Sequence, residues 1–186
     1  MTTDRQTRLD ERRAAILAAA RTSADDGGWA AVTTRGLSAA IGYSQPVLYG
    51  HFPGGKAEIM RTVALEGFVD LRQRCRTAIE VAGDESGRDR RALIAALAHA
   101  YLDFADAHPA VYEAMFAEPI GARFAEEGNE PELRDAFTVI AEVVGEDTTT
   151  EVLWSALHGM SLLERAGRMK VADRAQRVAD LSVRFA

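Results

Sequence analysis

Hydrogen-bonding side chains recur between Thr33 and Lys56 at a spacing that suits contact with a phosphate backbone and with base edges. The segment reads TTRGLSAAIGYSQPVLYGHFPGGK and holds Gln45, Tyr49 and His51. Amide, phenol and imidazole groups donate hydrogen bonds to phosphate oxygens or to the edges of bases. The apolar residues between them predict that these three side chains face outward from a short helix.

A first helix is expected to precede them. Leu37, Ala40 and Ile41 recur at the three- and four-residue spacing of a helix face turned toward a core. Thr33 suits the N-cap, because its hydroxyl accepts a hydrogen bond from a free amide of the first turn. Gly42 is expected to end the helix, since glycine adopts the left-handed C′ conformation at little cost.

A second, shorter helix follows the glycine. Ser44 is expected to cap it, and Pro46 suits its first turn, where a missing N–H costs nothing. Val47, Leu48 and Phe52 supply the inward face. A helix, a tight turn and a short second helix form the plan of a helix-turn-helix, whose second helix enters the major groove of DNA.

This segment resembles the tetracycline-repressor (TetR) family of bacterial transcription regulators over roughly residues 10 to 65. Ser38 replaces the family's usual alanine, Tyr43 replaces its usual valine, and the link 53–55 is one residue longer. None of these departures removes a phosphate-binding group, although Tyr43 bears on how the second helix seats. The matching residues are Gly28-Trp29, Thr33, Arg35-Gly36-Leu37, Ala40, Gly42, Ser44, Leu48-Tyr49-Gly50-His51-Phe52, Lys56 and Ile59.

Helix N-termini at Thr33-Thr34, at Ser44 and at Gly54-Gly55-Lys56 present free amides and a positive dipole end to a phosphate. Lys56 adds a positive charge at the third of them. The candidate DNA-contacting residues are Thr33, Thr34, Arg35, Ser44, Gln45, Pro46, Tyr49, His51 and Lys56.

Within this set, Gln45 is the candidate for reading a base edge such as adenine N6 and N7, and Pro46 the candidate for a thymine methyl. The resemblance implies that Tyr49 and His51 bind phosphate. The alternative is that both side chains pack into the core of the helix-turn-helix domain.

Composition predicts an all-α fold. Apolar residues make up 47% of the 186, enough for a core, and strand-like alternation is nearly absent. The net charge of −6 is uneven: residues 1–56 hold seven basic and five acidic residues, and 57–186 hold fifteen and twenty-three. A basic head on an acidic body suits a DNA-reading domain joined to a body that stays off DNA. We predict a DNA-binding domain over residues 1–55 and a helical effector-binding and dimerisation domain over 56–186.

Cysteine usage and hydropathy point to a cytoplasmic protein. Cys75 is the single cysteine, so no intrachain disulfide forms, and a structural role is favoured over a redox sensor. The longest apolar stretch, Ala14–Ala20, is too short to span a membrane, and no signal-peptide core is present.

Hydrophobic periodicity and helix-breaking residues define the remaining elements. Loops are expected over 83–90 and over 119–131, the latter with a helical turn near 123–127. Helices are predicted over 8–27, 56–82, 91–107, 109–116, 132–144, from Asp147 or Thr148 to about 165, and along the apolar row Val171, Ala175, Val178, Leu181 and Phe185.

Bulky side chains among many alanines predict a pocket for a small, mainly apolar effector in the body. The alternative is that each fills the core. Segments 108–112 and 154–159 resemble the C-terminal domain of one subgroup of the family, which does not name a ligand, and Tyr101 or His158 is the candidate polar contact. The candidate ligand residues are Phe68, Tyr101, Phe104, Tyr112, Met115, Phe116, Phe137, Trp154 and His158.

Two C-terminal helices with broad apolar faces predict a homodimer. One head contacts too little DNA for tight specific binding, so two heads are needed about one helical turn apart. The resemblance implies a four-helix interface, whereas the alternative turns both faces into their own core. The candidate interface residues are Val152, Ala156, Met160, Leu163, Val171, Val178, Leu181 and Phe185.

Enzyme chemistry has little support in the sequence. No Glu-x-x-His pair, phosphate loop, GxGxxG or GxSxG motif is present. His99 and Asp103 lie one helical turn apart, which is commoner as a surface pair than as a metal site. We therefore expect no catalytic residues, no cofactor and no metal, and a transcription regulator that binds operator DNA, most simply a ligand-released repressor. The competing interpretations are a regulator without an effector and, less favoured, a helical enzyme or carrier.

Overall fold

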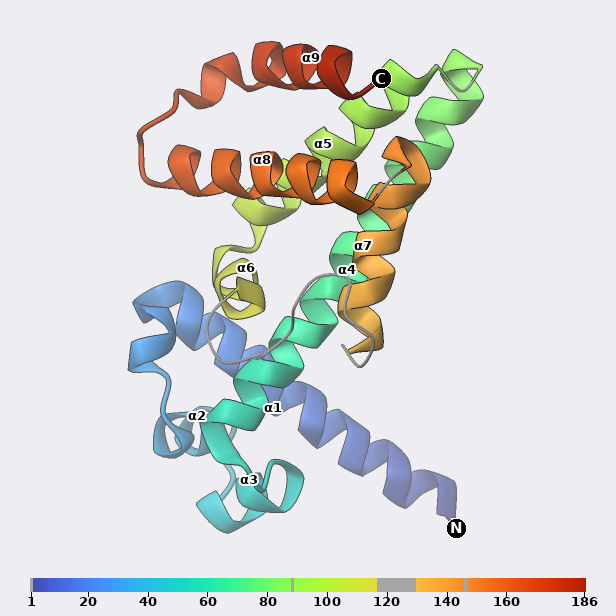
Figure 1. The fold of residues 1–186 in the computed structure, drawn as a ribbon. Coiled ribbons are helices and arrows are strands. Elements are labelled where there is room, and N and C mark those ends of the chain that lie inside the picture. The colour runs from blue at the N-terminus through green and yellow to red at the C-terminus, as the bar shows by residue number, and fades with distance from the viewer. Residues whose placement is uncertain (1, 88, 117–129, 146) are drawn as a thin grey trace. The chain divides into compact units, whose positions relative to one another are not determined.

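The computed structural model describes residues 2–87, 89–116, 130–145 and 147–186, and these residues form helices and turns with no strand among them. The predicted all-α fold is confirmed. The chain divides into two compact units, whose elements are labelled in Figure 1. Unit 1 comprises Met1–Gly67 and Pro109–Ile120, and unit 2 comprises Phe68–His108 and Gly121–Ala186. The division falls after Gly67, inside the helix Gly55–Ser86, whereas the sequence placed the domain boundary after residue 55, at the start of that helix.

Unit 1 is built on a long first helix. It contains α1 (Thr2–Ala31), α2 (Thr34–Ala40), α3 (Gln45–His51), the first part of α4 (Gly55–Ser86) and α6 (Pro109–Phe116). α1 is longer than the predicted 8–27 and is kinked at Gly28, whose φ of 72° and ψ of 165° are non-helical. Such a positive φ favours glycine.

The core of unit 1 is apolar and well buried. Ile16, Leu48 and Phe52 have no exposed surface, and Leu37 is also buried. The first helix of the motif differs from prediction, since Ala40 is exposed and Ser38 is buried. The inward face of α2 is therefore formed by Leu37 and Ser38 and not by the predicted row of Leu37, Ala40 and Ile41.

The short helix α6 packs within unit 1, although it lies far from the other elements in sequence. A Cβ added at Gly67 of α4 would meet Val111 Cγ1 at 2.6 Å and Met115 Sδ at 2.8 Å, so glycine permits the approach of α6. Figure 1 shows α6 alongside α1 and α4. α6 is thus part of the same compact body as the helix-turn-helix.

Unit 2 contains the remainder of α4, α5 (Arg90–Ala107), α7 (Pro131–Val144), α8 (Asp147–Arg165), a 3₁₀ turn (Val171–Asp173) and α9 (Arg174–Phe185). α5 packs against α7, α8 and α9, and α7 also packs against α8. The predicted bounds of α6 and α8 are confirmed. α4 extends past the predicted 82, and the last helix begins only after the 3₁₀ turn.

A buried carboxylate on α8 forms ion pairs with two arginines of α9. The Glu164 side chain is 3% exposed and accepts hydrogen bonds from Arg174 at 2.8 Å and from Arg177 at 2.6 Å. Arg174 also lies 3.1 Å from the carboxylate of Asp103 on α5. Burial alone would raise the pKa of Glu164, but these arginines hold it below its ordinary 4.5.

Two features of the chain complete the description. No helix among the described residues is both long and apolar enough to cross a lipid bilayer. The loop expected over 119–131 falls largely outside the described residues, and the helical turn expected near 123–127 falls wholly outside them.

Candidate nucleic-acid interface

The N-terminus of α2 is capped by Thr33, as predicted. Its Oγ1 accepts a hydrogen bond from the amide of Gly36 at 3.0 Å, and its backbone is extended. Gly42 then takes a φ of 69° in the turn before α3. These two residues fix where α2 starts and where the chain turns toward α3.

The short helix α3 exposes its first residues and buries its far side. Ser44 occupies the N-cap position but makes no side-chain capping hydrogen bond, and Pro46 lies in the first turn. Ser44, Gln45 and Pro46 are exposed, while Leu48 is buried. The start of α3 is therefore accessible to a duplex, as a recognition helix requires.

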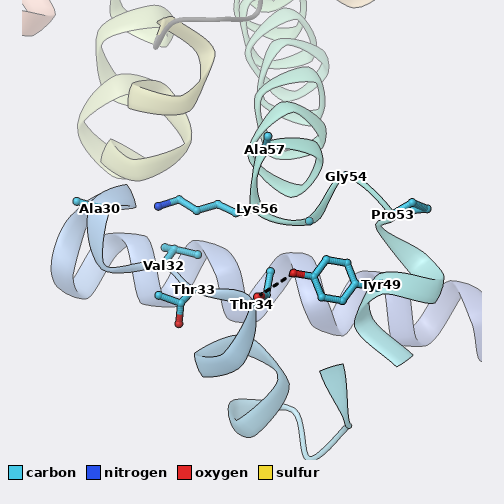
Figure 2. A pocket seen from close by; sticks show the side chains of 10 residues that line it. Ala30, Val32, Thr33, Thr34, Tyr49, Pro53, Gly54, Lys56 and Ala57 are labelled. Carbon is cyan, nitrogen blue, oxygen red and sulfur yellow. Dashed lines mark hydrogen bonds between the residues drawn. The ribbon is translucent and has the colours of Figure 1, made fainter. Parts of the chain in front are cut away.

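Tyr49 extends from α3 toward the start of α2. Its side chain is 44% exposed, and its hydroxyl lies 3.4 Å from Thr34 Oγ1, as Figure 2 shows. Its ring passes Gly55, where an added Cβ would lie 3.3 Å from Tyr49 Cε1. Two hydroxyl groups from different helices are thus brought to one place.

An open groove of about 570 Å³ lies at this junction. Figure 2 shows Thr33, Thr34, Tyr49 and Lys56 around it, from α2, α3 and the start of α4. Helix N-termini favour anions, because first-turn amides lack carbonyl partners within the helix. The lining residues are Ala30, Val32, Thr33, Thr34, Tyr49, Pro53, Gly54, Gly55, Lys56 and Ala57.

At the helix N-terminus Gly54-Gly55-Lys56, predicted to bind phosphate, some of the hydrogen-bond donors already have partners within the protein. Glu58 accepts the amide of Gly54 at 2.8 Å, and the Phe52 carbonyl accepts that of Gly55 at 2.9 Å. The ammonium of Lys56 donates to the Trp29 carbonyl. The next amides in the first turn of α4 are those of residues 56 and 57. Helix geometry gives neither of them a carbonyl partner within α4, so they are the amides that suit an anion.

His51 is placed less openly than predicted. It is half-buried at the end of α3, and its carbonyl accepts a hydrogen bond from Arg13 Nη1 at 3.1 Å. The Arg13 guanidinium also lies 4.2 Å from the centroid of the Phe52 ring. Arg35 is exposed on the first turn of α2.

The list of candidate DNA-contacting residues left out two residues that lie beside the motif. Arg12 lies with its guanidinium carbon 5.4 Å from the centroid of the Tyr43 ring, and Tyr43 is itself exposed in the turn between α2 and α3. The clustered arginines at the start of the chain were a signal for Arg12. Nothing in the sequence joined it to Tyr43, because their contact depends on how α1 packs.

Family comparisons match both ends of the chain. The model of bacterial regulatory proteins of the tetR family matches residues 16–63, and that of the tetracyclin repressor-like C-terminal domain matches residues 94–186. An uncharacterised HTH-type transcriptional regulator of Mycobacterium tuberculosis is 30% identical, over 94% of this chain and 79% of that protein.

The chain belongs to the tetR family of bacterial regulatory proteins. Its helix-turn-helix is the DNA-binding part of a transcription regulator. Membership of a family of regulators, rather than of catalysts, accords with the expectation that the chain is not an enzyme.

Solved structures share the tetR-family fold. SCO4313, described as a regulatory protein, superimposes with a TM-score of 0.74 at 21% identity, covering 97% of both chains. A protein of unknown function from Rhodococcus sp. RHA1 gives 0.70 at 24% identity, covering 93% and 92%. The TetR family regulator PfmR from Thermus thermophilus gives 0.60 at 22%, covering 91% and 97%.

The residues predicted to bind a ligand fall into both units of this tetR-family chain. In unit 2, the Trp154 indole donates to the Tyr101 hydroxyl at 2.9 Å and stacks on Phe137 with ring centroids 5.8 Å apart. Phe68 and Phe104 are also buried there. Tyr112, Met115 and Phe116 belong to unit 1, and the first two of them are buried.

Two further titratable side chains in unit 2 have pKa values that burial shifts. Burial raises the pKa of Cys75 to about 12, so its thiol stays protonated at neutral pH. This favours the structural interpretation of Cys75 over a redox sensor. Burial also lowers the pKa of His158, which is half-buried on α8, and so favours the neutral form of its imidazole.

The residues predicted at a dimer interface differ in exposure. Val152, Leu163 and Val171 are exposed, at 54%, 41% and 53%. Met160 and Val178 are buried within the chain, because their sides of α8 and α9 face inward. Ala156, Leu181 and Phe185 are half-buried.

Proposed function

We propose that this protein is a homodimeric repressor that leaves a near-palindromic operator when a small, mainly apolar molecule binds its body. The observation that carries the DNA-binding part is the groove where Tyr49 meets Thr34 beside the exposed start of α3. Phosphate there fixes the register of the helix, and Gln45 and Pro46 then meet base edges.

A binding selection tests sequence-specific recognition. Purified parent protein is incubated with a random-sequence duplex library, and the bound fraction is amplified and sequenced. The proposal predicts an inverted repeat with half-sites about one helical turn apart, or a multiple of it. Gln45→Ala is then expected to relax preference at one position of each half-site, with Arg134→Gln in unit 2 as the control. A selection that yields no enriched sequence would count against the operator.

Support for a dimer comes from a row of exposed and half-buried residues on α8. Val152, Ala156, Gly159 and Leu163 recur at helix-face spacing, with small residues in the middle and exposed aliphatic residues at the ends. A Cβ added at Gly159 would meet no atom within 4 Å, so this face is open. Val183 on α9 is exposed as well, at 57%. A second copy of the chain would bury both helices in a four-helix contact.

Sedimentation equilibrium tests the dimer with a matched pair of variants. Leu163→Asp puts a charge on the proposed interface, and Val81→Asp puts one on an exposed position of α4. The proposal predicts a dimer for the parent and for Val81→Asp, and a monomer for Leu163→Asp. A parent that sediments as a monomer at micromolar concentration would rule the dimer out.

Support for an apolar effector comes from the aromatic side chains buried in unit 2. The indole of Trp154 is hydrogen-bonded to the Tyr101 hydroxyl and stacked on Phe137. The polar ends of Tyr101 and Trp154 thus lie among apolar groups. An effector that prefers one arrangement by about 1–3 kcal/mol alters operator occupancy about 5- to 150-fold.

Thermal denaturation against a panel of apolar compounds separates the two regulator types. An effector raises the melting temperature, since it binds the folded protein alone, and it lowers affinity for the selected duplex. A regulator without an effector has a body filled by its own side chains, as the Tyr101–Trp154 contact also permits. That alternative predicts no compound with both effects.

A further inference from the structure

The first turns of α1 carry a row of arginines beside the helix-turn-helix. Arg5 and Arg8 are exposed, and Arg12 is half-buried. At about 100° per residue these three positions fall within about 60° of one another on the helix. Three acidic residues share these turns. Asp10 lies on the opposite side and accepts a hydrogen bond from Gln6, whereas the positions of Asp4 and Glu11 flank the row.

The row continues the buried face of the same helix. Ile16 follows Arg12 by one turn and has no exposed surface. Arg12 contacts Tyr43 in the turn between α2 and α3, so the row lies on the side of α1 that faces this turn, and it extends past the turn. Figure 1 shows the N-terminal turns of α1 projecting away from α2 and α3.

Tyr43 anchors the inner end of the row beside the recognition helix. Its ring lies under the Arg12 guanidinium, 5.4 Å from centroid to guanidinium carbon. Tyr43 directly precedes Ser44, the N-cap residue of α3. The arginine row thus begins next to the first turn of α3 and leads outward from it.

We infer that Arg5, Arg8 and Arg12 form a second cationic surface, which binds the phosphate backbone of the duplex flanking the base pairs under α3. From Arg5 to Arg12 the helix rises about 10 Å, over which one strand of B-DNA presents about three phosphates. Guanidinium groups pair with phosphate in a bidentate way. The tetR-family model matches from residue 16 onward, so the row precedes the matched part of the chain.

This inference rests on the proposed DNA binding, and a salt titration separates the two. The probe is a mixed-sequence duplex, since backbone contacts do not depend on sequence. Fluorescence anisotropy gives the affinity between about 50 and 200 mM salt for each protein. The test variant is Arg5→Gln/Arg8→Gln, and glutamine keeps the helix propensity of arginine. The control is Arg91→Gln/Arg134→Gln, which removes the same charge from exposed positions of unit 2.

The slope of log affinity against log salt is negative, and each lost phosphate contact reduces its magnitude by about 0.9. The test variant is therefore expected to show a slope shallower by about 1.8, and the control an unchanged slope. Equal slopes for the parent and the test variant, with Tyr49→Phe still weakened, would overturn the arginine row and leave the proposed function standing. A reduced slope with Tyr49→Phe unaffected would keep the row and refute the role of Tyr49. A parent that binds no duplex would overturn both.

Tyr43 is a positioning residue, and its ring supplies a second readout. Tyr43→Leu removes the aromatic platform under Arg12 and is expected to weaken binding, whereas Tyr43→Phe retains the ring and restores it. Equal affinities for the leucine and phenylalanine variants would show that the ring does not position Arg12.

Discussion

The indole Nε1 of Trp29 donates a hydrogen bond to the backbone carbonyl of Ala110 over 2.7 Å. Asp25 accepts the amide of the same residue at 3.3 Å, so the end of α1 holds both backbone polar groups of Ala110. The carbonyl of Trp29 in turn accepts from Lys56 at the groove. One residue therefore joins the first turn of α6 to the proposed phosphate site.

Removing the indole donor tests this junction. Trp29→Phe keeps an aromatic ring but leaves the buried Ala110 carbonyl without its partner, which costs about 1–3 kcal/mol. Urea denaturation of the parent and the variant measures the loss, with Tyr49→Phe as a control at an exposed ring. Equal unfolding midpoints for all three proteins would show that the bond contributes nothing to stability.

A methyl group at Gly67 is expected to force α6 away from α4. The new Cβ would meet Val111 and Met115 at 2.6 and 2.8 Å, and overpacking of this kind costs about 1–3 kcal/mol. Gly50→Ala is the matched control, because nothing lies within 4 Å of its Cβ position in α3. Thermal denaturation is predicted to lower the melting temperature for Gly67→Ala only. A Gly67→Ala protein as stable as the control would mean that α6 shifts freely.

The two N-cap residues of the motif are predicted to respond differently to alanine. Thr33→Ala removes a capping hydrogen bond and costs about 0.5–2 kcal/mol, whereas Ser44→Ala removes none. Chemical denaturation compares the stabilities, and anisotropy with the selected duplex compares the affinities. Ser44→Ala is expected to weaken DNA binding at nearly unchanged stability. The reverse pattern would assign the structural role to Ser44.

The Glu164 cluster predicts an acid-dependent loss of stability. Because its folded-state pKa lies below 4.5, the carboxylate stabilises the fold fully above that pH, and the contribution is lost as the pH falls through the folded-state pKa. Glu164→Gln breaks a buried pair and costs about 3–5 kcal/mol near neutral pH. Urea unfolding at a series of pH values should show the gap between parent and variant closing below 4.5. A gap that is constant with pH would refute the ionised state of Glu164.

Proline and polar residues that favour the start of a helix were enough to predict where two of the helices begin. α6 begins at Pro109 and α8 begins at Asp147, where the sequence placed the starts of both helices. α4 ran past its predicted end because Gly83 is tolerated inside a long helix, where neighbouring turns supply the hydrogen bonds. Tertiary packing overrides propensity at such positions.

The sequence predicted which side chains of α3 face outward, but it did not predict the contacts between the helices. Outward Gln45 and Tyr49 follow from helix periodicity within seven residues. The contacts of Lys56 with Trp29 and of Arg13 with His51 join residues 27 and 38 positions apart, and only the packing of α1 brings them together. The placement of Tyr112 in unit 1 is of the same kind, since sequence distance does not reveal which body a short helix joins.

The central claim is tested most directly by the affinity of Tyr49→Phe for DNA. The variant keeps the ring over Gly55 and removes only the hydroxyl beside Thr34. Anisotropy with the selected duplex and with a mixed-sequence duplex is expected to show the same loss on both, roughly 10- to 150-fold for one hydrogen bond to a charged group. Binding of both duplexes as tightly as the parent would contradict phosphate contact at this groove.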